Sequence, residues 1–352
     1  VGTKTLGYNN KKINRKVKEA IDLGTMSTLN SYEEVLLAEK LTKMHPWSKM
    51  VRFCRTGGEV NSLAIRIARA ATKRDKILFC GYHGWHDWYL SANLSSEDAL
   101  NEHLLTGLTP LGVPKVLAET SVPFEYGDLD FVEQQLSTKK FAALKMEVIR
   151  NKQPEKDYFK NLRKLCTKFG TVLIFDECTS GFRETFGGIH LKYKVYPDLC
   201  ILSKTLGNGF PISCVIGREN IMKKSSASFI SSTFWTDRVG FVAALATLDE
   251  MEKIKSWEII TERGNYYKKK MSKIFEQHKI EFEWSGLPSL IGYTIKSEHW
   301  LAVKTMITEE LLDLGYLHGA LFYPSVVHTN KDINKFVSAF SVVLKKISKI
   351  GY

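Results

Sequence analysis

A carboxylate and an amine each stand at the end of an apolar segment, and the two segments follow one another along the chain. Residues 172–175 lead into Asp176, and residues 199–202 lead through one serine into Lys204 and a glycine-containing turn. A buried carboxylate is costly without a partner, and a half-buried lysine can act as a nucleophilic amine. Ligands bind at the carboxyl ends of strands in open α/β sheets, so both side chains are candidates for chemistry.

Pyridoxal phosphate (PLP) is a cofactor that requires this pair. It needs an amine to form a Schiff base and an acid against its pyridinium nitrogen, which keeps that nitrogen protonated. On this hypothesis Lys204 is the amine and Asp176 is the acid. A buried Asp–Lys salt bridge fits the same spacing, so the residues alone leave both interpretations open.

Gly57 and Gly58 are candidates for holding a phosphate. They follow a predicted strand and open a predicted helix, where backbone N–H groups can approach an anion closely. A tight turn without a ligand has the same pattern. After the next predicted strand, Tyr82 could stack on a flat heterocycle. His83 and His86 in the same loop lack a third partner at a ligand spacing, which favours loop packing over a metal site.

Apolar segments alternate with amphipathic segments, which predicts an α/β fold with a mostly parallel sheet. Predicted strands cover 50–53, 76–80, 142–147, 171–176, 198–202, 212–217, 282–284 and 289–295, and predicted helices cover 59–72, 158–169, 238–253, 257–278, 300–314 and 333–350.

The pattern changes near residue 240, where long amphipathic helices replace the strand–helix alternation. We expect a large domain over 41–240, a small C-terminal domain over 241–352, and an N-terminal segment, 1–40, that packs on the small domain. The chain starts at Val1, so we also expect that a preceding segment has been lost.

The composition excludes several classes of protein. Hydrophobic residues make up 44% and charged residues 25% of 352 residues, which excludes a disordered chain, a collagen-like fibre and a coiled-coil rod. No apolar run is long enough for a membrane span. The net charge of +12 comes from scattered basic residues, which favours a lysine-rich surface over nucleic-acid binding and suits an acidic or phosphorylated substrate. Six sparse cysteines predict buried free thiols in a reducing compartment, the cytoplasm.

The run 173–183 followed by 198–204 resembles the signature of class III PLP-dependent aminotransferases, and the resemblance extends from about residue 7 to the C-terminus. The chain is similar to glutamate-1-semialdehyde aminomutase and the aminotransferases grouped with it. Segments 55–61, 81–90 and 322–329 resemble a sugar- or polysaccharide-linked branch of that group. The resemblance implies the type I PLP-dependent transferase fold, with the active site shared between the subunits of a homodimer.

The resemblance also implies roles for single residues. Lys204 is expected to form the internal aldimine and to carry protons, and Asp176 to pair with the pyridinium. Two departures are that Val148 replaces a common proline and Thr179 replaces a glutamine that often holds the ring hydroxyl. The other implied residues are Thr56, Gly57 and Gly58 at the phosphate, Tyr82 on the ring, Thr233 at the neighbouring subunit's phosphate, and Glu147 and His83 near the substrate.

The expected function is amino transfer through a pyridoxamine phosphate intermediate, from a small amine donor to a carbonyl acceptor that is a sugar or is linked to a nucleotide. One alternative is an aminomutase, in which one substrate supplies both amine and carbonyl. Another is a non-catalytic binding or structural homologue, against which the intact pair of Asp176 and Lys204 argues. Neither nucleic acid nor a membrane is an expected partner.

Overall fold

A seven-stranded sheet forms the centre of the large part of the chain in this computed structural model, which describes residues 1–103, 106–149 and 154–348. The strand order is β1-β7-β6-β5-β4-β2-β3, and all strands run in one direction except β7, which is antiparallel to both of its neighbours. The strands are β1 (Met50–Cys54), β2 (Lys76–Cys80), β3 (Ser121–Pro123), β4 (Phe141–Glu147), β5 (Val172–Glu177), β6 (Leu199–Leu202) and β7 (Ser213–Gly217).

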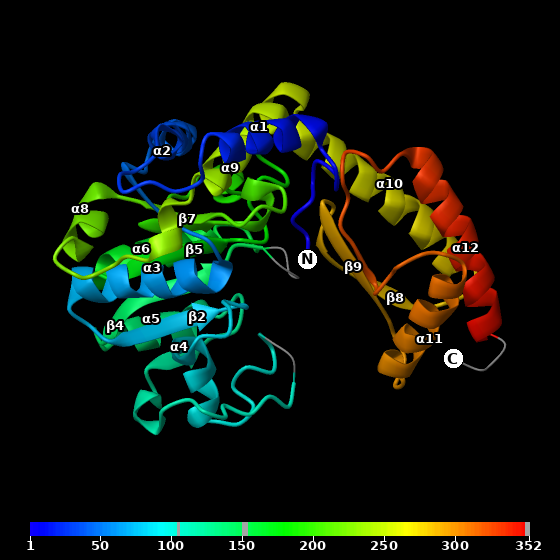
Figure 1. Cartoon of the computed structure of the whole chain (residues 1–352). Coiled ribbons are helices and arrows are strands. Elements are labelled where there is room, and N and C mark those ends of the chain that lie inside the picture. The colour runs from blue at the N-terminus through cyan, green and yellow to red at the C-terminus, as the bar shows by residue number, and fades with distance from the viewer. Residues whose placement is uncertain (104–105, 150–153, 349–352) are drawn as a thin grey trace.

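Helices cover both faces of this sheet (Figure 1). The long helix α3 (Gly57–Thr72) packs on one face with an apolar stripe. On the other face, α5 (Leu129–Ser137) and α6 (Tyr158–Phe169) share a core with β4 and β5. Three single-turn helices complete this part of the chain: α4 (Asp87–Leu90), α7 (His190–Tyr193) and α8 (Glu219–Met222). Strands buried on both faces explain why β4 and β5 read as nearly continuous apolar runs.

The N-terminal helices belong to the large unit. Helices α1 (Lys11–Asp22) and α2 (Tyr32–Met44) pack on α9 (Arg238–Ile254), and all three share one core with β6 and β7. The expectation that residues 1–40 pack on the small domain is therefore wrong for these helices, because their apolar faces complete the core on that side of the sheet. The first residues reach the small unit, where Thr5 O accepts hydrogen bonds from Val326 N and Ser325 Oγ.

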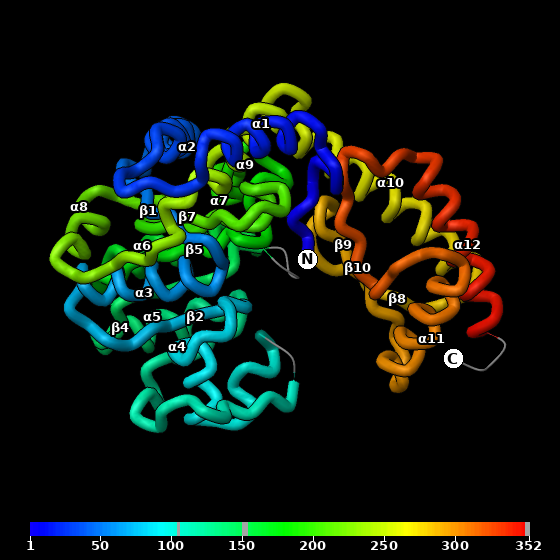
Figure 2. Tube along the Cα trace, in the orientation of Figure 1, coloured from blue at the N-terminus to red at the C-terminus, as the bar shows by residue number. Residues whose placement is uncertain are grey.

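The C-terminal part has its own core around a three-stranded antiparallel sheet of order β10-β9-β8. Its strands are β8 (Phe282–Leu287), β9 (Leu290–Ile295) and β10 (Leu321–Phe322), and its helices are α10 (Ser256–Gln277), α11 (Trp300–Asp313) and α12 (Asn330–Ser348). Figure 2 shows the N-terminal residues running between this unit and the large one. Since α9 contributes to the large core, the small unit begins at α10, beyond the boundary expected near residue 240.

The predicted fold class is confirmed: the molecule is α/β, with a mostly parallel sheet and a smaller unit. All six cysteines are buried and free, as expected. The predicted helix over 333–350 ends at Ser348, and the positions after it lie outside the described residues. Among the described residues, no helix combines the length and the apolar character that crossing a bilayer requires.

Candidate active site

Asp176 lies near the carboxyl end of β5, between the carboxyl ends of β4 and β6. Its side chain is only 2% exposed, and three groups surround the carboxylate. Oδ2 lies 2.8 Å from His83 Nδ1 and 3.5 Å from Lys145 Nζ, and Oδ1 accepts a hydrogen bond of 3.0 Å from Cys178 N. These contacts fix the carboxylate in a water-poor position, from which it can serve a cationic ring nitrogen.

The same contacts keep this carboxylate ionised. Burial alone would raise the pKa of Asp176, but the charge of Lys145 and the hydrogen bond with His83 outweigh burial and hold that pKa well below its usual range. Burial also lowers the pKa of His83, and Lys145 lowers it further. Asp176 is therefore a permanent anion at neutral pH.

Lys204 follows β6 and begins a short 3-10 turn, Lys204–Gly207. Its φ is +42°, a left-handed conformation that is unfavourable for a residue with a Cβ. Lys204 Nζ donates a hydrogen bond of 2.6 Å to Thr179 Oγ1, which in turn donates to Glu147 Oε1 at 3.3 Å. Glu147 Oε2 accepts from Tyr82 N at 2.9 Å. The amine is thus held at the carboxyl end of the sheet by a chain of hydrogen bonds that runs through Thr179 to Glu147.

The start of α3 has the form of an anion-binding cradle. Thr56 caps the helix, and its hydroxyl and Glu59 form a reciprocal capping box. The N–H groups of Gly57 and Gly58 make no hydrogen bond within the described part of the chain. A Cβ on Gly58 would come within 2.9 Å of His86 Nε2, so a larger residue would close the cradle. The phosphate site predicted from the two glycines is geometrically open.

Thr233 lies in a surface segment that begins the 3-10 turn Thr233–Thr236 and is exposed. Arg55, next to the cradle, holds this segment in place. Its guanidinium donates to the carbonyl oxygens of Phe234, Trp235 and Asp237. Thr233 therefore lies on the surface of the chain, and its contact with a neighbouring subunit's phosphate stays a prediction.

The remaining sequence predictions have different outcomes. Tyr82 is 36% exposed and lies edge-on to Tyr89, and its stacking on a ring stays a prediction. Substrate contact by His83 also stays a prediction, although its buried position behind Asp176 favours a role in holding the carboxylate. Sequence reasoning missed Lys145 and the hydroxyl of Thr179. Lys145 could have been identified from the sequence, because it is a lysine within an otherwise apolar predicted strand.

A second buried carboxylate supports the site from below. Glu177 accepts hydrogen bonds from Ser180 Oγ, from the N–H groups of Ile189 and His190, and from His190 Nδ1 at 2.6 Å. Burial raises the pKa of Glu177, but the bonds from His190 and Ile189 outweigh it and lower that pKa below 4.5. Cys200 lies at the same place, with Sγ 4.0 Å from His190 Nδ1. The cluster ties the end of β5 to the following loop.

The donor set fits PLP. The cofactor needs an anion for its ring nitrogen, an amine for its aldehyde and N–H donors for its phosphate. Asp176, Lys204 and the pair Gly57–Gly58 offer these groups at the carboxyl ends of neighbouring strands and at the start of α3. Lys204 would hold the aldehyde, and the left-handed backbone at this residue is a strain of the kind that persists at functional sites.

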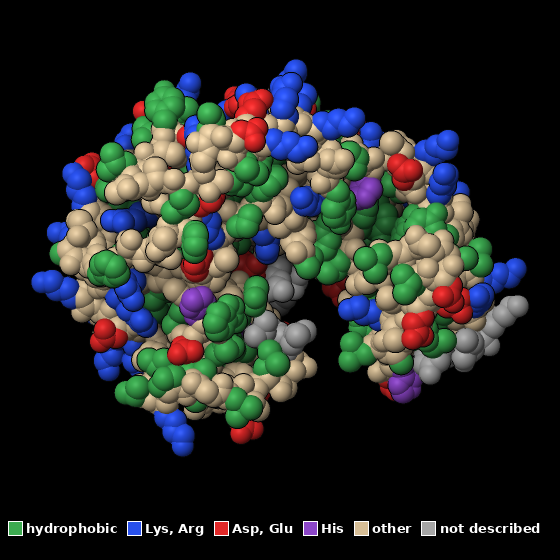
Figure 3. Space-filling view, viewed as in Figure 1, with side chains coloured by type: hydrophobic (Ala, Val, Ile, Leu, Met, Phe, Trp, Pro, Cys, Tyr) green, Lys and Arg blue, Asp and Glu red, His purple; other side chains and the backbone are tan. Residues whose placement is uncertain are grey.

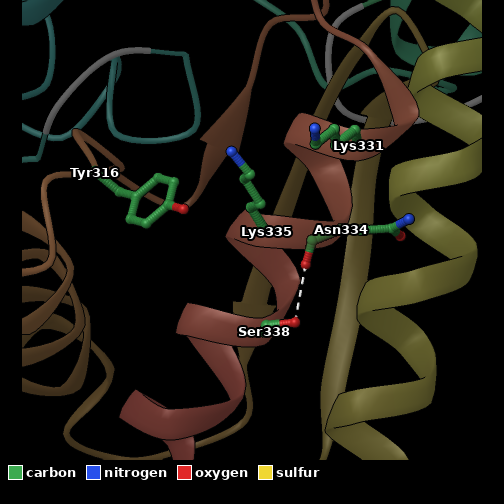
Figure 4. A pocket seen from close by; sticks show the side chains of 5 residues that line it. All are labelled: Tyr316, Lys331, Asn334, Lys335 and Ser338. Carbon is green, nitrogen blue, oxygen red and sulfur yellow. Dashed lines mark hydrogen bonds between the residues drawn. The ribbon is translucent and has the colours of Figure 1, made fainter.

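Two hollows lie outside this cluster. One lies along α12 and is lined by the exposed residues Lys331, Asn334, Lys335 and Ser338 together with Tyr316 (Figure 4). No carboxylate among the described residues lines it, so its lysines have no acid partner of the kind that Asp176 offers. The other is a cavity of about 770 Å³ between residues 1–8 and the small unit. Arg183 lines this cavity and donates a hydrogen bond to Thr179 O. Thr179 is also the residue whose hydroxyl accepts from Lys204, so Arg183 links the cavity wall to the candidate site. Of these two hollows, only the second has a lining residue that contacts a residue of the candidate site.

Known proteins are similar to this chain over nearly its whole length. Residues 2–344 match the family model described as aminotransferase class-III. The chain is 30% identical to glutamate-1-semialdehyde 2,1-aminomutase of Sulfurisphaera tokodaii, over 98% of this chain and 87% of that protein. It is 28% identical to 3-aminobutyryl-CoA aminotransferase of Cloacimonas acidaminovorans, over 98% and 83%.

Solved structures share the fold. The FumI protein of Sphingopyxis sp. MTA144, solved in its PLP internal aldimine form, superposes with a TM-score of 0.89 at 22% identity and covers 99% of this chain and 83% of that one. A transaminase with PLP bound gives a TM-score of 0.88 at 23% identity, over 98% and 85%. At these identities the likeness establishes the architecture of the chain.

Glu177→Gln tests the support beneath the site. The amide presents N–H groups to donors, so we expect a loss of about 3–5 kcal/mol in the free energy of unfolding at pH 7. Because folding lowers the pKa of Glu177, its contribution is complete above pH 4.5 and disappears as the pH falls through the folded-state pKa. The difference between wild type and variant should therefore shrink in acid, as measured by urea denaturation.

The matched control is Glu133→Gln, which removes an exposed ion pair with Lys168. Such pairs contribute about 0.2–1 kcal/mol, so this variant should stay close to wild type at every pH. An equal loss in both variants would contradict the role given to Glu177.

Proposed function

Because the chain belongs to the class-III aminotransferase family, as its match over residues 2–344 shows, we propose that it exchanges an amino group and a carbonyl oxygen between two small molecules. The cofactor is PLP. The observation that carries the proposal is the placement of an ionised Asp176 and the amine of Lys204 at the ends of adjacent strands β5 and β6. Asp176 and Lys204 have different partners, His83 and Thr179 respectively, which argues against a purely structural salt bridge between them.

PLP, when bound, supplies an electron sink for the charge that develops on the substrate carbon. Asp176 supports that sink by facing the ring nitrogen with a fixed negative charge. Gly57 and Gly58 anchor the phosphate through their N–H groups. Lys204 moves a proton at the substrate carbon, and Thr179 and Glu147 position its amine before and after the substrate enters. In this scheme Thr179 contacts the lysine, where a glutamine in many relatives would hold the ring hydroxyl.

A sugar- or nucleotide-linked carbonyl compound is the proposed acceptor. The net charge of +12 favours an anionic substrate. The cavity beside Arg183 has the volume of sites for ligands of this size, and Lys4 also lines it. Figure 3 shows Lys and Arg side chains spread over the visible face, an arrangement that suits a small anion better than a polyanion. One relative is named for a nucleotide-linked amine, an aminobutyryl-CoA.

Intramolecular transfer is the second candidate. It is supported by the 30% identity over 98% of this chain to a glutamate-1-semialdehyde 2,1-aminomutase. The residues at Asp176 and Lys204 would do the same work in either reaction. The two functions differ in whether a second substrate must enter, so kinetics separates them.

We further propose that the chain forms a homodimer with the active site at its interface. Exposed apolar side chains surround the phosphate cradle: Phe229, Phe234 and Trp85 are 84%, 65% and 71% exposed. Contacts place Phe234 and Trp85 near the start of α3, through Arg55 and Gly58, and place Phe229 farther along the helix, at Arg66. Such a concentration of apolar surface around a binding site is typical of an interface, and Thr233 lies within it.

Lys204→Ala tests the assignment of the amine. The variant should lose the yellow colour of the holoenzyme and the label that borohydride reduction fixes on the lysine, and turnover should fall by about 10²–10⁴-fold. Absorption spectra and peptide mapping measure both effects. Lys194→Ala is the control, since Lys194 is exposed and also has a left-handed backbone (φ +53°). A wild-type label on any lysine other than Lys204 would overturn the assignment.

A substrate panel tests the reaction type. We expect turnover only when an amine donor and a separate carbonyl acceptor are both present, with keto-sugar nucleotides preferred over simple keto acids. The measurement is the coupled formation of amine and carbonyl products by chromatography. Isomerisation of glutamate-1-semialdehyde added alone would establish the second candidate instead.

Phe234→Glu tests the interface. Light scattering should give wild-type protein twice the 40.1 kDa mass of the chain, whereas the variant should be mainly monomeric and should retain less PLP. Leu301→Glu is the control, because Leu301 is 76% exposed on α11 of the small unit. A wild-type protein that stays monomeric at micromolar concentration would refute the dimer.

A further inference from the structure

Lys145 is a charged side chain in the middle of the buried sheet. It lies on β4 between Phe79 of β2 and Ile174 of β5, and its side chain has no exposed surface. Lysine is almost never fully buried unless it is paired. Within the described part of the chain no well-aligned hydrogen bond satisfies its amine, and Asp176 Oδ2 lies 3.5 Å away, close enough for an ion pair. The fold therefore buries this amine below the site, with Asp176 as its neighbour.

The same oxygen of Asp176 serves His83. Both ring nitrogens of His83 face acceptors: Nδ1 is 2.8 Å from Asp176 Oδ2, and Nε2 is 3.1 Å from Cys80 O. An ionised carboxylate and a carbonyl only accept, so both contacts are hydrogen bonds only when both nitrogens carry protons. His83 and Lys145 thus compete to be the counter-ion of one carboxylate, and burial, opposed by Asp176, lowers the pKa of each.

Few other charged groups face this cluster. Glu147 follows Lys145 on the same face of β4, and its charge favours the protonated forms of both Lys145 and His83. The thiol of Cys178, which follows β5, also faces this cluster. Burial is the largest cause that raises its pKa well above the usual value; the charge of Asp176 raises it further, and that of Lys204 lowers it. The buried residues of α3 are apolar, including Val60, Leu63 and Ala64, except for Asn61, whose side chain carries no charge. No described group from α3 therefore supplies a second anion.

We propose that Lys145 is a positioning residue that acts on PLP through Asp176: by sharing Oδ2 with His83, it weakens the hold of the carboxylate on the ring nitrogen of the cofactor. The inference rests on the proposed placement of Asp176 at that nitrogen. A ring nitrogen with a weaker partner is less strongly protonated, so Lys145 sets how strongly the ring withdraws electrons. The effect is one of charge, exerted from beneath the cofactor and out of contact with substrate.

The test uses the affinity of the full-length apoprotein for PLP and for its 1-deaza analogue, in which carbon replaces the ring nitrogen. Only PLP can use the carboxylate at that position, so the ratio of the two affinities reports this contact alone. Lys145→Met keeps the length of the side chain and removes its charge. We expect the ratio to rise about tenfold, the effect of one neighbouring charge on an ionisable group. Fluorescence titration measures both affinities without any turnover.

Leu144→Met is the matched control, because Leu144 is the preceding residue on β4 and packs into the core on the opposite face. It introduces the same side chain without a change in charge and should leave the ratio unchanged. Lys145→Gln is a second neutral variant, which keeps a donor for Asp176, and it should also raise the ratio. Agreement between the two neutral variants assigns the effect to charge.

Two results would overturn the inference, and they are distinguishable. If wild type binds PLP more tightly than the analogue but neither neutral variant changes the ratio, Lys145 does not act on the ring nitrogen, and the proposed function stands. If wild type binds both compounds equally, Asp176 does not serve that nitrogen, and the placement of the cofactor falls together with the inference.

Discussion

The buried, ionised carboxylate of Asp176 is the interaction on which the rest of the site depends. A lone anion with 2% exposure would be expelled or neutralised. Here the neighbouring strand supplies Lys145, the loop after β2 supplies His83, and the backbone at Cys178 adds a hydrogen bond. Each contact requires a particular register of β4 against β5 and a particular path of the loop. The buried charge of Asp176 therefore requires this local arrangement of strands and loop. The same arrangement holds the carboxylate where a cofactor can contact it.

Lys204 is held by a different kind of constraint. Its backbone has the left-handed conformation, and the hydroxyl of Thr179 restrains its amine while also binding Glu147. This chain of hydrogen bonds keeps the amine near the carboxyl ends of β4, β5 and β6, within reach of an incoming aldehyde. The buried contacts of Glu177 fix the loop that carries Thr179, so the restraint on the amine depends on a carboxylate that never meets the substrate.

The sequence predicted six of the seven strands of the central sheet, all but β3, and singled out Asp176, Lys204 and the glycine cradle, because strand ends and glycine turns leave local signals. It missed α1 and α2, whose short amphipathic segments acquire their place only by packing on α9, far along the chain. Lys145 was missed for a related reason. Within residues 141–147 it interrupts a run that otherwise reads as a buried strand, and its partner Asp176 becomes its neighbour only through the pairing of β4 with β5.

The arrangement of charges explains how one site can bind the phosphate of the cofactor firmly and still interact only weakly with its ring nitrogen. Lys145 and His83 lie beside the single carboxylate of Asp176, with Glu147 the other acid that acts on both. A doubly charged phosphate would be held separately, by the N–H groups of Gly57 and Gly58 and the dipole at the start of α3, which favours binding of the whole cofactor. The ring nitrogen, in contrast, must share the carboxylate of Asp176 with the side chains of His83 and Lys145. Affinity and ring protonation are thus set by different parts of the site, so a change at Lys145 can alter the second without destroying the first.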